Sequence, residues 1–391
     1  MPGGPAFALR PRDLRRGAVL TLVFLGVLGT AAATGCWDRD TPADPVPQAH
    51  GRAAATGYRE AVERAAAQAV ADGKSGKQAA EDVVSRSGDR WGAVYDHAEY
   101  AEFEQALGGH YTGVGLFVER AADGTVTLTR LQSGGPAARA GLRPGDRLVS
   151  VDGRAVTGLR PGQVTALLRG DARRARPGSP VVLVLRRGGH TWTRTLHRAR
   201  LSTEPVTVQR LPGGVLLIKV SSFTRGSGAR VRSAVKAAPA GAGVMLDLRG
   251  NRGGLVTEAV SAASAFLDGG LVATYDVRGD QRALYADRGG DTGRPLVALV
   301  DGGTMSAAEL VTGALQDRGR AVTVGTRTFG KGSVQMPTAL PDGSVAELTV
   351  GHYRTPAGRS LDGRGINPDL VAADRTEEQA RGVLGGLGVA R

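Results

Sequence analysis

The chain has 391 residues, of which 59 are glycine and 4% are aromatic, and this composition fits two or three α/β domains with many tight turns better than a disulfide scaffold. The single cysteine, Cys36, excludes an internal disulfide and argues against redox or zinc chemistry. The net charge of +13 comes mainly from scattered arginine. The one dense basic run, 169–176, has no interleaved aromatic residues for base stacking, so we expect no nucleic-acid partner.

The amino terminus has the pattern of an export segment. Four arginines between positions 10 and 16 precede residues 17–37, which carry no charge and would span roughly 31 Å as a helix, about one hydrocarbon core. We therefore expect residues 1–37 to be a signal or membrane anchor and the rest of the chain to be extracytoplasmic, anchored or secreted. The segment could be retained, cleaved near residues 31–33, or lipidated at Cys36, and these three alternatives stay open.

A proline-containing linker, 38–56, is expected next. Helices are then predicted over 58–71, 77–85 and 98–107 from a composition rich in Ala, Glu and Gln with glycine breaks. We treat 57–110 as an N-terminal helical region.

The pattern changes at Tyr111 to short strands, predicted over 115–119, 125–131, 147–151 and 181–186, with a helix over 161–169. The stretch 133–153, with its Gly-Leu-Arg-Pro-Gly-Asp signature, resembles the PDZ family in its bacterial protease form. We assign 111–199 to this domain. The resemblance implies that the loop formed by Thr112, Gly113, Val114, Gly115 and Leu116 captures a chain-terminal carboxylate, and that the peptide adds as a strand.

Beyond residue 200 the chain alternates between the two types of element. Strands are predicted over 214–220, 243–248, 295–300 and 321–325, and helices over 255–267 and 306–317, which indicates a β/α layered core over 200–372. Residues 373–391 are expected to be a C-terminal tail.

Two residues in this region offer a nucleophile and a base. Ser306 follows a strand and a tight turn and begins a helix, where unpaired N–H groups stabilise negative charge. Lys331 is one of only five lysines among 50 basic residues, and a buried amine can become neutral whereas a guanidinium cannot. The alternatives are ordinary: Ser306 with Glu309 also forms a capping box, and Lys331 could be an exposed loop residue.

A second turn favours the catalytic interpretation. Residues 246–255 again run from a buried strand into a helix through paired glycines, and two such turns side by side can supply the N–H donors of an oxyanion hole. Together with the segment 355–369, these blocks resemble the carboxy-terminal processing peptidases, also called tail-specific proteases.

That resemblance implies a serine endopeptidase with a ClpP/crotonase-like layered core and an inserted PDZ domain. It implies Ser306 as nucleophile, Lys331 as general base and Gln335 holding the lysine, with an oxyanion hole of Ala307 and either Gly253 or Gly254. It implies no cofactor or metal. The expected partners are protein C-terminal tails and, through the N-terminal segment, a membrane; a homo-oligomer or an adaptor protein is left open, as is whether the PDZ domain activates or inhibits.

Two positions depart from the family pattern, Arg252 where proline is frequent and Ala308 where serine is frequent, and both put specificity rather than chemistry in question. Arg169 is a candidate contact between a loaded PDZ domain and the protease.

Other functions fit the sequence less well. A phosphate-binding loop at 325–331 lacks the Ser or Thr after Lys331, and Pro337 opposes the helix it requires. None of the six histidines lies in a recognisable triad or metallohydrolase motif. A non-catalytic PDZ adaptor is disfavoured because Ser306, Lys331 and Gln335 are all present.

Overall fold

The computed structural model describes residues 52–170, 176–277 and 280–388. They fall into two compact units, one of residues His110–Ser202 and the other of residues 52–109 together with Thr203 onward. The predicted export segment and most of the predicted linker lie outside the described residues. Within the described ranges, no helix combines the length and the apolar character needed to span a bilayer.

The unit His110–Ser202 is built on an antiparallel sheet. Its elements are β2 (His110–Gly113), β3 (Leu116–Arg120), β4 (Val126–Leu131), α5 (Pro136–Arg139), β5 (Arg147–Val151), β6 (Arg154–Ala155), α6 (Pro161–Arg169), β7 (Pro180–Arg187), β8 (His190–His197) and β9 (Ala199–Ser202). The strand order is β3-β4-β5-β7-β8, while β2 and β9 pair separately and join the two ends of the unit. Alternate residues of β7, Val181, Leu183 and Leu185, face a core that α6 covers with Val164 and Leu168.

The second unit contains a six-stranded sheet of order β10-β11-β12-β15-β16-β19. Its elements are β10 (Val206–Leu211), β11 (Val215–Val220), α7 (Ser227–Lys236), β12 (Gly243–Asp247), α8 (Val256–Ala263), β15 (Leu296–Val300), α9 (Ala307–Asp317), β16 (Val322–Gly325), β19 (Leu370–Val371) and α10 (Thr376–Gly386). All neighbouring strands are parallel except β10, which runs antiparallel to β11. A parallel sheet needs cover on both faces, and here helices supply it.

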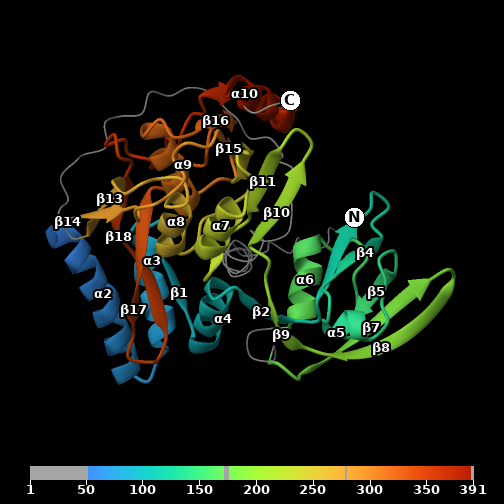
Figure 1. Ribbon diagram of the computed structural model, residues 1–391. Coiled ribbons are helices and arrows are strands. Elements are labelled where there is room, and N and C mark those ends of the chain that lie inside the picture. Colours follow the sequence, from blue (N-terminus) through green and yellow to red (C-terminus); the bar gives the residue numbers. More distant parts are fainter. Residues whose placement is uncertain (1–51, 171–175, 278–279, 389–391) are drawn as a thin grey trace, which may run out of the picture. The chain divides into compact units, whose positions relative to one another are not determined.

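The central strand β12 is buried along its whole length because it faces two cores. Val244 and Leu246 point into the core formed with α7, α8 and α9, whereas Met245 points into the core formed with α10. Helix α10 packs on this second face through Ala380 and Leu384 (Figure 1). The predicted C-terminal tail therefore contributes a structural helix.

A second sheet, of order β1-β18-β13-β14 with β17 also paired to β18, belongs to the same unit. The elements are α2 (Arg52–Ala71), α3 (Gly76–Arg86), β1 (Ala93–Tyr95), α4 (His97–Leu107), β13 (Leu271–Val277), β14 (Asp280–Tyr285), β17 (Ser333–Ala339) and β18 (Val345–Arg354). Buried side chains of α2 and α3, among them Val62 and Ala80, pack with Leu348 of β18. The N-terminal helical region is thus joined to the region that holds Lys331.

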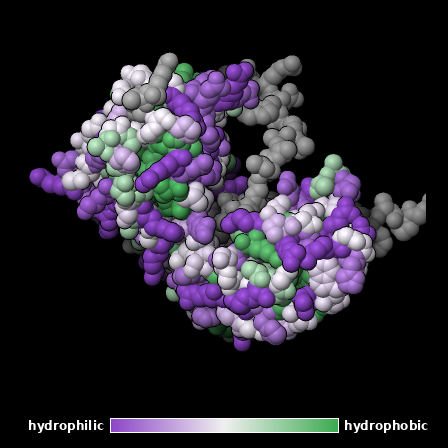
Figure 2. Space-filling view, turned by 45° about the vertical axis from the view of Figure 1, so that its right-hand side comes forward, coloured by the Kyte–Doolittle hydropathy of each residue, from purple (hydrophilic) through white to green (hydrophobic). Residues whose placement is uncertain are grey.

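This architecture confirms the predicted mixed α/β fold with a helical N-terminal region. The helix predicted over 255–267 is shorter in the structure, where α8 ends at Ala263. Hydrophobic side chains on the visible surface gather in patches bordered by hydrophilic residues (Figure 2). One apolar groove lies between β10 and α7, lined by Val206, Val208 and Ala234 among others, and none of the predicted catalytic residues lines it.

Candidate active site

Ser306 lies at a sharp turn between the buried strand β15 and helix α9. Its φ of 56° makes it one of three non-glycine residues with positive φ in the described part of the chain. Such a conformation costs about 1–3 kcal/mol and persists only where the surroundings enforce it, whereas an ordinary N-cap residue has extended backbone. The predicted capping-box bond, which the Ser306 N–H donates to Glu309, is present at 2.9 Å. Capping alone does not explain the positive φ of Ser306.

Glu309 connects the Ser306 turn to the Lys331 segment. The side chain is fully buried. Its Oε1 accepts hydrogen bonds from the Thr328 hydroxyl at 2.6 Å and the Gly330 N–H at 2.7 Å. Its Oε2 accepts from the N–H groups of Ser306 at 2.9 Å and Lys331 at 2.8 Å. The sequence analysis treated Glu309 only as a capping residue, and the structure shows that it fastens two segments together.

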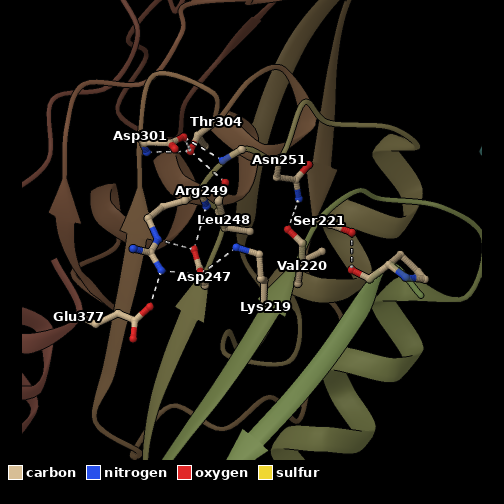
Figure 3. Close-up of polar contacts among 12 residues, drawn as sticks. Lys219, Val220, Ser221, Asp247, Leu248, Arg249, Asn251, Asp301, Thr304 and Glu377 are labelled. Carbon is tan, nitrogen blue, oxygen red and sulfur yellow. Dashed lines mark hydrogen bonds and ion pairs between the residues drawn. The ribbon is translucent and has the colours of Figure 1, made fainter. Parts of the chain in front are cut away.

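The turn before Ser306 is also fastened to the turn after β12, as Figure 3 shows. Asp301 Oδ1 accepts from the N–H groups of Gly250 at 2.9 Å and Gly303 at 2.8 Å. The Thr304 hydroxyl donates to the Leu248 carbonyl at 3.0 Å. The two glycine-containing turns predicted to lie side by side are therefore in direct contact.

This contact brings the predicted oxyanion-hole residues together. A Cβ on Gly253 would lie 3.0 Å from both the Ala307 nitrogen and the Ser306 Cβ, so only glycine fits there. The Gly253 N–H donates to Asn251 Oδ1 at 2.8 Å. In the part of the chain that the structure describes, the Ala307 and Gly254 N–H groups donate to no protein acceptor. Of the two glycines left open by the sequence, this geometry favours Gly254 as the second donor.

A buried ion pair supports the base of the same turn. Asp247, at the end of β12, is 1% exposed and accepts from Arg249 Nε at 2.9 Å and NH2 at 2.8 Å (Figure 3). The Lys219 amine lies 3.2 Å from the Asp247 carboxylate. Arg249 also pairs with the carboxylate of Glu377 in α10, at 2.7 Å. Burial acts to raise the pKa of Asp247, but the Arg249 bonds and the Lys219 charge outweigh it and hold that pKa below its ordinary value.

The Lys331 side chain lies against aromatic and acidic neighbours. Its Nζ is 4.7 Å from the centroid of the Trp91 ring. Burial lowers the pKa of the Lys331 amine, an effect that Glu347 and Asp89 partly oppose. Burial also raises the pKa of Glu347 to about 7, against the influence of Lys331. Both groups are thus shifted toward their neutral forms, which is what a lysine base requires.

No hydrogen bond joins Ser306 Oγ to Lys331 Nζ among the described residues, so proton transfer requires a closer approach than this arrangement provides. Gln335 donates to Ser333 Oγ at 2.9 Å and Thr349 Oγ1 at 3.1 Å. Its expected role in holding Lys331 stays a prediction.

The predicted carboxylate-capture loop, 112–116, joins β2 to β3 beside α6. The carbonyl of Val114 accepts from Ala137 N–H at 2.9 Å, and that of Gly115 accepts from Gln132 N–H at 2.8 Å. Gly115 has a φ of 73°, and a Cβ there would lie 3.2 Å from Gln132. These contacts constrain the backbone of the loop, and its role in binding a carboxylate stays a prediction. Arg169 lies over the ring of Tyr111 in the same unit, and its proposed signalling role stays a prediction.

The structure also tests the other readings of this region. The chain after Lys331 enters the strand β17 instead of the helix that a phosphate-binding loop needs. His352 pairs with Asp362, and this contact raises the pKa of the histidine. In residues 52–170, 176–277 and 280–388, no group of three or more His, Cys, Asp or Glu side chains is arranged to hold a metal ion.

Sequence reasoning missed Asp89, Trp91 and Glu347 as neighbours of Lys331. The residues that face Lys331 from β18 and from the N-terminal region are far away along the chain, so no local motif could have joined them. Position 91 offered one weak signal, a tryptophan in a chain with only three.

Comparisons with known proteins agree with this geometry. Residues 214–372 match the model of peptidase family S41, and residues 127–187 match that of the PDZ domain. The chain is 31% identical over 302 residues to the carboxy-terminal-processing protease of Bartonella bacilliformis, covering 73% of this chain and 68% of that protein. It is 36% identical over 292 residues to the chloroplastic C-terminal processing peptidase of Tetradesmus obliquus, covering 69% and 62%.

Among solved structures, the photosystem II D1 C-terminal processing protease is similar with a TM-score of 0.50 and 31% identity, covering 80% of this chain and 86% of that one. The α/β fold and the turn around Ser306 define an S41-type peptidase architecture with a PDZ domain. The chain belongs to the carboxy-terminal processing proteases of this family. It spans 65% of the length of the Bacillus subtilis relative, the protease CtpA, to which it is 29% identical.

Proposed function

We propose that the protein is a serine endopeptidase that uses a Ser306–Lys331 dyad and cuts proteins near their C-termini. The observation that carries this proposal is the Glu309 carboxylate, which holds the backbone of a strained serine and that of a partly buried lysine in one hydrogen-bonded assembly. A structural serine cap needs no such partner. The amine of a lysine on the surface would stay fully hydrated.

In the proposed mechanism, the neutral Lys331 amine removes the proton from Ser306 Oγ, and the oxygen attacks the peptide carbonyl. The N–H groups of Ala307 and Gly254 stabilise the resulting oxyanion. Lys331 then gives the proton to the leaving amine, and a water molecule hydrolyses the acyl enzyme by the same route. Gln335 positions the lysine once it has approached Ser306.

The substrate class follows from the PDZ unit. We expect the loop 112–116 to bind the terminal carboxylate of a protein tail, while the apolar side chain of the terminal residue packs near α6. Family relatives are named for C-terminal processing, which agrees with such a substrate. The carboxylate requirement separates this function from general proteolysis.

The same proposal places the catalytic unit outside the cytoplasm. It rests on the basic and then uncharged N-terminal segment. A phosphatase reporter fused after residue 60 should be active only when exported, and Cys36→Ala should release the protein from membranes only if the anchor is a lipid. A fusion that is produced at a normal level but shows no phosphatase activity would refute this location.

The activity is tested with the purified chain and an unstructured peptide that ends in an apolar residue with a free carboxylate. We expect cleavage that Ser306→Ala and Lys331→Arg each reduce by about 10⁴-fold or more. Lys236→Arg, a change at an exposed lysine, is the matched control and should cut normally. An amidated peptide should be cut more slowly. Undiminished cleavage by either dyad variant would refute the mechanism, and binding without cleavage by the unaltered chain would favour a PDZ adaptor instead.

A further inference from the structure

The N-terminal helical region places an aromatic ring on the proposed base. Trp91 lies in the short loop between α3 and β1. Its ring is 4.7 Å from Lys331 Nζ and makes an edge contact with the Phe329 ring at 5.9 Å. The Arg90 guanidinium also lies 5.0 Å from its centroid. Trp91 therefore contacts residues on both sides of Gly330.

Hydrogen bonds to β18 hold the loop that carries this ring. Asp89 accepts from the Thr349 N–H at 2.9 Å and from its hydroxyl at 2.7 Å. The same carboxylate accepts from the N–H groups of Trp91 at 3.1 Å and Gly92 at 2.9 Å. From Ala93 onward the chain pairs with β18 as strand β1. Both ends of the Trp91 loop are thus attached to the strand beside Lys331.

Ordinary core packing does not account for the indole. The ring is only partly buried, and it belongs to none of the hydrophobic clusters formed by the described residues. Its nearest functional neighbour is the Lys331 amine. An apolar face over an amine excludes the water that would otherwise solvate the ammonium form, and so favours the neutral form. The attraction between the ring and an ammonium acts in the opposite direction, by about 0.5–2 kcal/mol.

We propose that Trp91 is a positioning residue for the base: before Lys331 approaches Ser306, the indole shields its amine from water, and the loop between α3 and β1 thereby becomes part of the peptidase site. The inference rests on the proposed function. It extends that function by making residues 87–95 part of the machinery, although Trp91 itself touches no substrate. Removal of the ring hydrates the amine and also removes the attraction of the ring for the ammonium; we expect the hydration to dominate, so that the amine holds its proton to higher pH.

The first measurement is the pH profile of peptide cleavage by the full chain, from pH 5 to 10. The neutral amine is the active form, so kcat/KM, which reports the free chain, rises as pH passes the Lys331 pKa. The acidic groups that face the amine are the same in every variant: Glu347, Asp89, Asp362 and Glu309. In Trp91→Ala this rise should move to higher pH by about one unit, which lowers the rate about tenfold at pH 7 and restores it at alkaline pH. Trp91→Phe keeps an apolar ring and should keep the pH profile. A Trp91→Ala profile with an unmoved rise, or one moved to lower pH, would refute the shielding.

The second measurement does not depend on catalysis. Trace acetylation with acetic anhydride at a series of pH values, read by mass spectrometry, gives the pH at which Lys331 becomes half reactive, with exposed Lys236 of the same molecule as reference. In a Ser306→Ala background, the additional Trp91→Ala change should raise that midpoint. Trp192→Ala, which removes an aromatic ring from the other unit, is the control and should leave it unchanged.

The two measurements separate the two proposals. A midpoint that moves as expected in a chain that cuts no peptide would refute the proposed function alone. Normal cleavage with equal midpoints in the presence and absence of Trp91 would refute the shielding alone. Should Trp91→Ala fail to fold, as judged by its thermal transition, Trp91→Leu replaces it, because leucine leaves the amine partly open and should give a smaller shift in the same direction.

Discussion

Replacement of the Glu309 carboxylate by an amide should uncouple the Ser306 turn from the Lys331 segment. A carboxylate can only accept, and all four of its partners are donors. In Glu309→Gln, one oxygen remains and the other becomes an NH2 group that faces two donors. If the amide oxygen faces the Ser306 and Lys331 N–H groups, the Gly330 bond is lost while the Thr328 hydroxyl can turn to accept from the NH2 group. In the opposite orientation, the Ser306 and Lys331 bonds are both lost.

The size of the effect follows from this count. A hydrogen bond to a charged group contributes about 1.5–3 kcal/mol, so the loss of one or two costs about 1.5–6 kcal/mol of the 5–15 kcal/mol that typically stabilises a domain. For a domain of 150–250 residues, this lowers the melting temperature by roughly 3–24 °C. Because Glu309 also aligns the proposed dyad, and misplacement by about 1 Å can cost roughly 100-fold in rate, peptide cleavage should fall by about that factor.

Thermal unfolding followed by circular dichroism, and peptide cleavage at a temperature where the variant is still folded, test both expectations. Glu378→Gln is the matched control, since Glu378 is exposed and its contact with Arg375 spans 3.8 Å. It should change neither quantity appreciably. A melting temperature for Glu309→Gln within 2 °C of the unaltered chain would show that the carboxylate is not needed to hold the two segments.

Three further changes probe the turns and the PDZ loop. Asn251→Ala removes the acceptor of the Gly253 N–H, which holds the backbone that leads into the proposed donor Gly254, and should lower kcat about 10–100-fold with little change in KM; a change confined to KM would contradict the oxyanion geometry. Asp247→Asn breaks the ion pair with Arg249 and should lower the free energy of unfolding by about 3–5 kcal/mol at pH 7. Because the folded-state pKa of Asp247 is depressed, this contribution is present above the unfolded-state pKa and is lost as pH falls through the folded-state pKa. The free energies of unfolding that urea titrations give for the two proteins should therefore converge in acid. Gly115→Ala places a Cβ in a positive-φ position and should weaken binding of a fluorescent C-terminal peptide about tenfold, whereas equal anisotropy curves would remove the loop from the proposed binding site.

The sequence predicted the residues whose roles are set by local order. Ser306 could be placed at a helix start because apolar periodicity and the preceding buried strand define that junction. The glycine pair after β12 was recognised for the same reason. The layered core followed from alternating apolar strands and helices, and the N-terminal helices from a composition rich in Ala, Glu and Gln with glycine breaks.

Other elements depend on partners far along the chain. Helix α10 carries three glycines and has a weak helical preference, so it was treated as a tail; burial of Ala380 and Leu384 against the sheet stabilises it. Strand β14 is almost entirely exposed and shows no clear apolar alternation, so its pairing with β13 could not be foreseen. The contact of Trp91 with Lys331 is of the same non-local kind.

The pairing of β1 with β18 has a consequence for how the molecule matures. The carboxylate of Asp89 and the backbone of Thr349, which it binds, are separated by 260 positions. Contacts of such sequence separation form late, because the intervening chain must first be ordered. A nascent polypeptide that has already formed its first helices still lacks Lys331. It also lacks β18, the strand that binds the loop of Trp91. The proposed peptidase site is therefore complete only after the chain has been synthesised as far as Thr349, and a shorter nascent chain lacks one of its parts.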